Sequence, residues 1–220
     1  MADVVGNVAE IRRAIDAVAV GPVEIMAVTK NHSPEEINPL AQTEIRRIGE
    51  NRVQEFVDKI DKLNSRFEPH IIGHLQRNKV KYIINRAAMV QSLDRLELAQ
   101  ELDRQAQAHG VVMPVLVQVN VAREPQKGGV YLEGYESLMD AVSRLPGVSV
   151  RGLMAIMPIS DHPEELRGLF RQMRTLFERE RDRARQFVTM DILSMGMTHD
   201  YLVAASEGAT MVRLGHAIFG

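Results

Sequence analysis

The chain has 220 residues, of which 45% are hydrophobic and 25% charged, and this size and composition fit one well-packed domain. The formal net charge of -2 gives no electrostatic reason to expect a nucleic acid or an anionic membrane as the main partner. The absence of cysteine excludes disulfides, thiolate metal sites and cysteine nucleophiles.

The first twenty residues predict an amphipathic helix. Apolar residues recur at helical spacing over about residues 3–19, at Val4, Val8, Ile11, Ile15 and Val18. Acidic and basic residues are interspersed among them, which a signal peptide would not tolerate, and no apolar run in the chain approaches the length of a membrane span. We therefore expect a cytoplasmic protein that has no membrane partner.

After this helix, strand-like and helix-like segments alternate along the chain. Eight segments are predicted as strands: 24–29, 45–49, 70–73, 88–91, 114–120, 150–156, 191–195 and 210–214. Helical patterns occur at 34–42, from residue 52 onward, and at 95–108, 134–145, 163–185 and 201–207. Strict alternation predicts a parallel sheet with crossover helices. The fold class expected for residues 1–220 is α/β, a single (β/α)8 TIM barrel with an extra N-terminal helix.

Lys30 is the first candidate functional residue, because it follows the first predicted strand. Barrel enzymes carry their chemistry at the carboxyl ends of the strands, and a desolvated lysine amine forms Schiff bases with carbonyl compounds. The alternative fold is an open doubly wound sheet. Such a sheet usually has a glycine-rich turn after its first strand, and Lys30-Asn31-His32 is not such a turn.

The segments after the seventh and eighth strands predict a phosphate site. Gly196 and Gly215 would let backbone N–H groups approach an anion, and Ser194 and Thr198 could add hydroxyl donors. A helix that begins near 198–200 would direct its free N–H groups the same way. Each glycine taken alone is better explained by an ordinary turn, and Thr198 by a helix cap. The pairing of the two segments favours phosphate.

A Schiff-base lysine and a phosphate site on one barrel mouth match the aldehyde and the anion of pyridoxal 5′-phosphate (PLP). Arg213 would then face the pyridine nitrogen. Because a guanidinium does not readily lose its proton, Arg213 would keep that nitrogen unprotonated and weaken the ring as an electron sink. The alternative is that Arg213 pairs with a buried carboxylate such as Asp191 or Glu50.

Several long motifs occur in order along nearly the whole chain. They are residues 27–30 (AVTK), 48–55 (IGENRVQE), 70–79 (HIIGHLQRNK), 151–154 (RGLM), 193–197 (LSMGM), 207–215 (EGATMVRLG) and 217–220 (AIFG). Through these motifs the chain resembles the pyridoxal phosphate homeostasis protein family, also called the YggS or PROSC family. That family is related to the N-terminal domain of alanine racemase.

The resemblance implies a fold-type III barrel in which Lys30 holds PLP as a Schiff base and Arg213 faces the pyridine nitrogen. It implies phosphate contacts from five positions: Ser194, Gly196, Thr198, Gly215 and residue 216. The family usually has serine where this chain has Thr198, and threonine or serine where it has His216. Thr198 keeps the hydroxyl, whereas the His216 side chain could donate only in the right tautomer or charge state, which would make binding pH-dependent.

Three further residues complete the expected cofactor site. Asn51 follows the second strand, His74 follows the third, and Met154 lies near the end of the sixth, where it could pack on the pyridine face. His74 replaces a proline of the family, and it either lies near the cofactor or occupies a turn. The seven histidines show no paired ligand spacing, so no metal site is expected, and we expect four of them at the surface or in turns: His70, His109, His162 and His199.

Three functions are compatible with these residues, and a PLP carrier ranks first. Such a protein would hold PLP reversibly on Lys30 and deliver it to apo-PLP enzymes, without robust catalysis. An amino-acid racemase ranks second because it needs a second base, commonly tyrosine. The four tyrosines fall on predicted helices or their approaches: Tyr82, Tyr131, Tyr135 and Tyr201. A Schiff-base aldolase ranks third, since aldolase lysines usually lie on a later strand. We expect a monomer that binds PLP and no nucleic acid.

Overall fold

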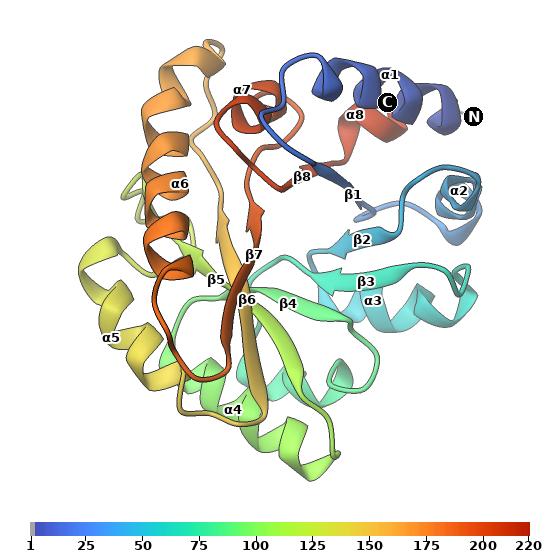
Figure 1. Ribbon diagram of the computed structural model, residues 1–220. Coiled ribbons are helices and arrows are strands. Elements are labelled where there is room, and N and C mark those ends of the chain that lie inside the picture. Colours follow the sequence, from blue (N-terminus) through green and yellow to red (C-terminus); the bar gives the residue numbers. More distant parts are fainter. Residues whose placement is uncertain (1–2) are drawn as a thin grey trace.

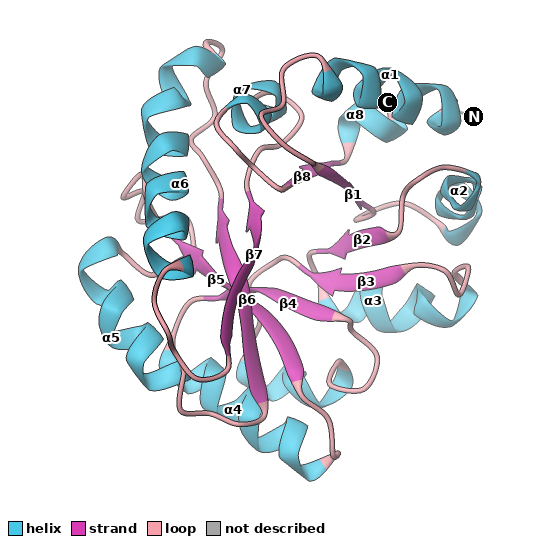
Figure 2. Ribbon diagram, viewed as in Figure 1, coloured by secondary structure: helices cyan, strands magenta, loops and turns pink. Residues whose placement is uncertain are grey.

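Eight parallel strands pair in chain order and close into a barrel (Figures 1 and 2). The structure, a computed structural model, describes residues 3–220. The strands are β1 (Glu24–Val28), β2 (Arg47–Glu50), β3 (Glu68–Ile71), β4 (Met89–Leu93), β5 (Met113–Val119), β6 (Val148–Ala155), β7 (Val188–Ser194) and β8 (Met211–Leu214). Closure depends on the pairing of β8 with β1, in which Leu214 lies opposite Ala27. The predicted TIM barrel is confirmed, and the open doubly wound alternative is wrong.

Helices surround the barrel and cover the outer faces of its strands (Figure 2). The α-helices are α1 (Val4–Asp16), α2 (Pro34–Ile37), α3 (Val53–Lys59), α4 (Leu96–Ala108), α5 (Leu132–Val142), α6 (Arg167–Arg181), α7 (Tyr201–Ser206) and α8 (His216–Phe219). Four 3-10 helices join them: η1 (Asn38–Gln42), η2 (Ile60–Lys62), η3 (Arg77–Tyr82) and η4 (Pro163–Leu166). The predicted helix at 34–42 is split into α2 and η1 because Pro39 lacks the N–H group that a continuous α-helix requires.

The predicted N-terminal helix is present as α1, and it ends earlier than the expected 3–19. The Asp3 side chain accepts a hydrogen bond from the Gly6 N–H group and thereby caps the helix. Val18 lies beyond the helix and is exposed. Helix α1 lies beside α8, so the described ends of the chain are neighbours (Figure 1). Between residues 3 and 220, none of the helices combines the length and apolar character needed to cross a membrane.

Successive side chains along each strand point alternately into the barrel interior and into the layer under the helices. On β1, Met26 and Val28 pack inward with Ile72 and Met211, whereas Ala27 belongs to the core between strands and helices. The inward position after Val28 is residue 30, at the carboxyl end of the strand. The mouth at this end therefore receives the side chains that follow the strands.

His70 lies inside the barrel, and its predicted surface location is wrong. Its side chain is only 1% exposed, because His70 occupies an inward position of β3 beside Gly49 of β2. Gln91 on β4 donates from Nε2 to His70 Nδ1 at 2.9 Å, which places the imidazole proton on Nε2. Burial lowers the pKa of His70 from 6.5 to about 3, so the ring is neutral at pH 7.

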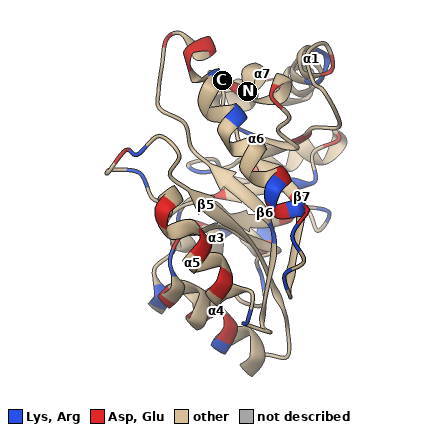
Figure 3. Cartoon of the chain, turned by 60° about the vertical axis from the view of Figure 1, so that its left-hand side comes forward, with Lys and Arg blue, Asp and Glu red and all other residues tan. Residues whose placement is uncertain are grey.

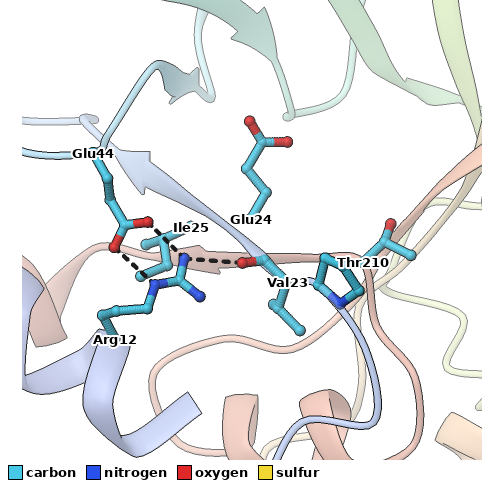
Figure 4. Close-up of a pocket in the computed structure, with 7 residues that line it drawn as sticks. Arg12, Val23, Glu24, Ile25, Glu44 and Thr210 are labelled. Atoms are coloured by element: carbon cyan, nitrogen blue, oxygen red, sulfur yellow. Dashed lines mark hydrogen bonds and ion pairs between the residues drawn. The ribbon is translucent and has the colours of Figure 1, made fainter. Parts of the chain in front are cut away.

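A pocket of about 370 Å³ lies at the opposite end of the barrel, where β1 and β8 begin (Figure 4). Arg12 of α1 reaches into it and makes a two-point contact with Glu44, with both N···O distances 2.8 Å. Arg12 also donates to the Val23 carbonyl oxygen at 2.9 Å. Because these contacts join α1 to the start of β1, they stabilise the fold at this end of the barrel. Elsewhere on the surface, acidic and basic residues are interspersed along α4 and α6 (Figure 3).

The buried neutral His70 predicts a loss of stability in acid. Unfolding restores its ordinary pKa of 6.5, so this contribution is complete above pH 6.5 and is lost as the pH falls toward 3. Between pH 7 and pH 5 the loss from this one group is about 2 kcal/mol. In His70→Gln, the new amide oxygen can still accept from Gln91. Urea titrations are expected to show that the free energy of unfolding of this variant falls by about 2 kcal/mol less between pH 7 and pH 5 than that of the unmutated protein. The exposed His162→Gln serves as the control, and equal pH dependence in His70→Gln and the unmutated protein would contradict the assignment.

Candidate functional site

A tight turn presents Lys30 at the mouth of the barrel. The His32 N–H group donates to the Thr29 carbonyl oxygen at 3.2 Å, and Asn31 between them has a φ of 64°, in the left-handed region that asparagine tolerates. Lys30 is exposed, and the alternation along β1 places it on the inward side, two residues after Val28. The turn thus leaves the Lys30 amine accessible from solvent.

A second lysine lies beneath this turn, and its ammonium is already engaged. Lys59 at the end of α3 is 9% exposed, and its Nζ lies 2.7 Å from Glu50 Oε1. Lys59 also donates to the Thr29 carbonyl oxygen at 2.7 Å. Burial raises the pKa of the Glu50 carboxyl, against the opposing effects of Lys59 and Thr29. Of these two lysines, Lys30 is the one that can react with a ligand.

Arg213 on β8 points into the barrel just below the mouth. Its side chain is buried, and Nη1 donates to the Ser194 carbonyl oxygen and to Ser194 Oγ, each at 2.8 Å. Nη2 donates to the Ala155 carbonyl oxygen at 2.7 Å. Burial lowers the pKa of Arg213 to about 10, which still leaves the guanidinium protonated at neutral pH. The Nε–H group has no protein acceptor within residues 3–220, so it remains available to a ligand.

The alternative partners considered for Arg213 are engaged elsewhere. Asp191 pairs with Arg151 at 2.6 Å, and Glu50 pairs with Lys59. The interpretation that Arg213 forms a buried ion pair with Asp191 or Glu50 is therefore wrong.

Ser194 belongs to a buried polar chain. Its hydroxyl donates to Gln91 Oε1 at 2.8 Å and accepts from Arg213, so the chain of contacts runs from Arg213 through Ser194 and Gln91 to His70. Ser194 is fully buried. A direct contact between its hydroxyl and phosphate stays a prediction, because in this structure the hydrogen of that hydroxyl is used by Gln91.

The segments after β7 and β8 lie against each other, as the phosphate hypothesis requires. Gly196 has a φ of 94°, and its carbonyl oxygen accepts from the Arg213 N–H group at 3.0 Å. Thr198 Oγ1 accepts from the Ala217 N–H group at 3.4 Å. In the described segments after β7 and β8, the backbone N–H groups for which no protein acceptor is found include those of Thr198, Gly215 and His216. These groups, together with the Thr198 hydroxyl, form a donor set suited to an anion.

Gly215 joins this donor set to the strand that carries Lys30. A Cβ atom at Gly215 would lie 3.3 Å from the Val28 carbonyl oxygen, so the loop after β8 packs directly on the end of β1. His216 is exposed at the start of α8. Whether its side chain contacts phosphate stays a prediction.

Three other expected site residues differ in how closely they approach the mouth. Asn51 is half-buried after β2, and its backbone packs against Gly73 after β3. The His74 side chain is 61% exposed, with Nδ1 3.7 Å from Asp94 Oδ2. Met154 is fully buried in the barrel interior with Met89 and Leu116. For all three, contact with a cofactor stays a prediction.

Sequence reasoning missed the residues that support the site from below. Gln91 and His70 orient Ser194, while Lys59 supports the turn at Lys30. The inward alternation of His70 on β3 and Ile72 just after it was a signal for His70. No comparable signal marks Lys59, since a lysine that ends a helix is usually solvated.

The donors at the mouth fit PLP. An exposed amine suits the aldehyde, the spare Arg213 N–H group suits the pyridine nitrogen, and the free N–H groups near Thr198 and Gly215 suit the phosphate. Within residues 3–220, no group of three or more His, Asp or Glu side chains is arranged to hold a metal ion.

Comparisons with known proteins agree with this geometry. The family described as alanine racemase, N-terminal domain, matches residues 4–220. A pyridoxal phosphate homeostasis protein of Aquifex aeolicus is 41% identical over 90% of this chain and 86% of its own length. The corresponding protein of Escherichia coli K12 is 36% identical over 100% of this chain and 97% of its own length.

Solved structures show the same barrel. PipY of Synechococcus elongatus, 31% identical, matches with a TM-score of 0.90 without PLP and 0.88 with PLP bound, and in each case 99% of this chain and 100% of PipY are covered. Alanine racemase of Clostridium difficile 630 is 13% identical with a TM-score of 0.76, and the match covers 98% of this chain and 56% of the racemase, which shows a shared fold. The chain belongs to the pyridoxal phosphate homeostasis protein family, whose barrel resembles the N-terminal domain of alanine racemase.

Proposed function

We propose that this chain holds PLP as a Schiff base on Lys30 and acts in PLP homeostasis as a carrier that delivers PLP to apo-enzymes. The observation that carries the proposal is the exposed Lys30 amine on the same barrel mouth as Arg213 and the free N–H groups after β7 and β8. PipY, a relative that matches along nearly the whole chain, has a structure with PLP bound. These facts support PLP as the ligand of this chain.

In this proposal, different residues bind different parts of PLP. When bound, PLP supplies an aldehyde that condenses with a primary amine, and Lys30 provides that amine. The backbone N–H groups of Gly215 and His216 and the Thr198 hydroxyl would hold the phosphate. Arg213, protonated and fixed by the acceptors of Ser194 and Ala155, would oppose protonation of the pyridine nitrogen.

One feature favours a carrier over a racemase. A two-base racemase needs a second acid/base, and the tyrosines lie on helices or at their ends: Tyr82 ends η3, Tyr131 precedes α5, Tyr135 is buried in α5 and Tyr201 begins α7. The proposal includes a monomeric, cytoplasmic protein, and both of these attributes stay predictions.

Lys30→Ala is expected to abolish the visible absorbance of the Schiff base. The variant should lose at least about tenfold in PLP affinity, because the covalent contribution disappears while the phosphate and Arg213 donors remain. Its affinity for pyridoxine 5′-phosphate, which has no aldehyde, should stay within about twofold of the unmutated protein. Absorbance titration measures PLP binding, calorimetry measures the analogue, and Lys81→Ala is an exposed control. Equal PLP affinity with and without Lys30 would contradict the proposal. A protein that binds no PLP would also contradict it, and sugar phosphates would then be tested as ligands of Lys30.

Transfer of PLP should distinguish the carrier from an enzyme. The loaded protein is expected to restore the activity of an apo-PLP enzyme up to the amount of PLP that it carries, measured by titrating one against the other. The same loaded protein should not racemise alanine, followed by circular dichroism or chiral chromatography. Many turnovers of racemisation that disappear in Lys30→Ala would instead identify an enzyme.

A further inference from the structure

The turn that carries Lys30 is supported from below by a single buried ammonium. Lys59 Nζ donates to the carbonyl oxygens at both ends of the turn, to Thr29 at 2.7 Å and to His32 at 3.3 Å. These two residues flank Lys30 and Asn31, so the contacts of Lys59 span the whole turn. Lys59 comes from α3, which follows β2, so the support for the lysine turn of β1 comes from the neighbouring βα unit.

Two carboxylates complete this support. Glu50 is 1% exposed, accepts from Lys59 at 2.7 Å, and also accepts from the Thr29 hydroxyl. Glu55, one helical turn before Lys59, accepts from the Asn31 N–H group at 3.0 Å. The Lys30 turn is therefore held at Thr29, Asn31 and His32 by groups that lie outside it, whereas Lys30 and Asn31 are exposed to solvent.

We propose that Lys59, held in place by Glu50, is a positioning residue that directs Lys30 toward the aldehyde of PLP. The inference rests on the proposed function, in which Lys30 is the covalent ligand. In that reaction the Lys30 amine nitrogen bonds to the aldehyde carbon, and the aldehyde oxygen leaves as water with the two amine protons. A backbone that is already fixed beneath Lys30 loses no further conformational entropy when the bond forms, so only the side-chain rotamers have to be ordered.

Lys59 is unsuited to being the covalent ligand itself. Its nitrogen has a carboxylate and two carbonyl acceptors within 3.3 Å, and its side chain is 9% exposed. Reaction there would break all three contacts and leave Glu50 buried without its cation, which is costly. Its contacts therefore support a role through Lys30.

A charge-balanced double variant tests the proposal. Lys59→Met combined with Glu50→Gln removes the ammonium and the carboxylate together, which avoids leaving one buried charge unpaired. Affinity for PLP is expected to fall about tenfold, while affinity for pyridoxine 5′-phosphate should stay within about twofold. In the ligand-free protein, the Asn31 and His32 amides should exchange hydrogen faster than in the unmutated chain. Lys62→Met, an exposed lysine three residues away, is the matched control and should behave like the unmutated protein.

A second variant separates the contribution of Lys59 from that of Glu50. Glu50→Gln alone leaves the Lys59 donors on the two carbonyl oxygens and is expected to keep more PLP affinity than the double variant. The proposal is overturned if the double variant binds PLP as the unmutated protein does. It is also overturned if both ligands weaken equally, since that would indicate a merely structural role. Failure of the proposed function would look different, because Lys30→Ala would then bind PLP normally.

Discussion

The pairing of β8 with β1 is the constraint on which the candidate site depends. It closes the barrel, and it brings the loop at Gly215 into contact with the end of the strand that precedes Lys30. Arg213 and Lys30 are distant in the sequence, yet both occupy inward positions at the carboxyl ends of these two paired strands. The amine proposed for the aldehyde, the cation proposed for the ring and the N–H donors proposed for the phosphate therefore lie at one end of the barrel because the barrel closes.

The site combines a rigidly held arginine, Arg213, with an accessible lysine, Lys30. Arg213 is fixed by carbonyl oxygens of β6 and β7, and the polar chain continues through Ser194 and Gln91 to the neutral His70. Buried polar groups are costly unless they are satisfied, so this series of hydrogen bonds favours one arrangement of the Arg213 guanidinium. The Lys30 side chain, in contrast, extends from a turn into solvent. Such an arrangement suits reversible capture and release of a reactive aldehyde.

Much of the fold was predictable because alternation and helical period are local signals. All eight strands lie near their predicted positions, and the motifs placed Lys30 and Arg213 at strand ends. Side-chain pairing across the barrel was not predictable, because it depends on register between segments far apart in sequence. Lys59 and Glu50 illustrate this limit, since nothing local distinguishes a buried lysine at a helix end from a solvated one. The engagement of the Ser194 hydroxyl by Gln91 depends in the same way on how β4 and β7 face each other across the interior.

The most direct test of the account is to locate the covalent adduct. The PLP-loaded protein would be reduced with borohydride, digested and mapped by peptide mass spectrometry. We expect the pyridoxyl mass on the peptide that contains Lys30, with Lys59 unmodified under native conditions. Modification mainly at Lys59, or spread over exposed lysines in proportion to their accessibility, would contradict the assignment of Lys30 as the residue that holds PLP.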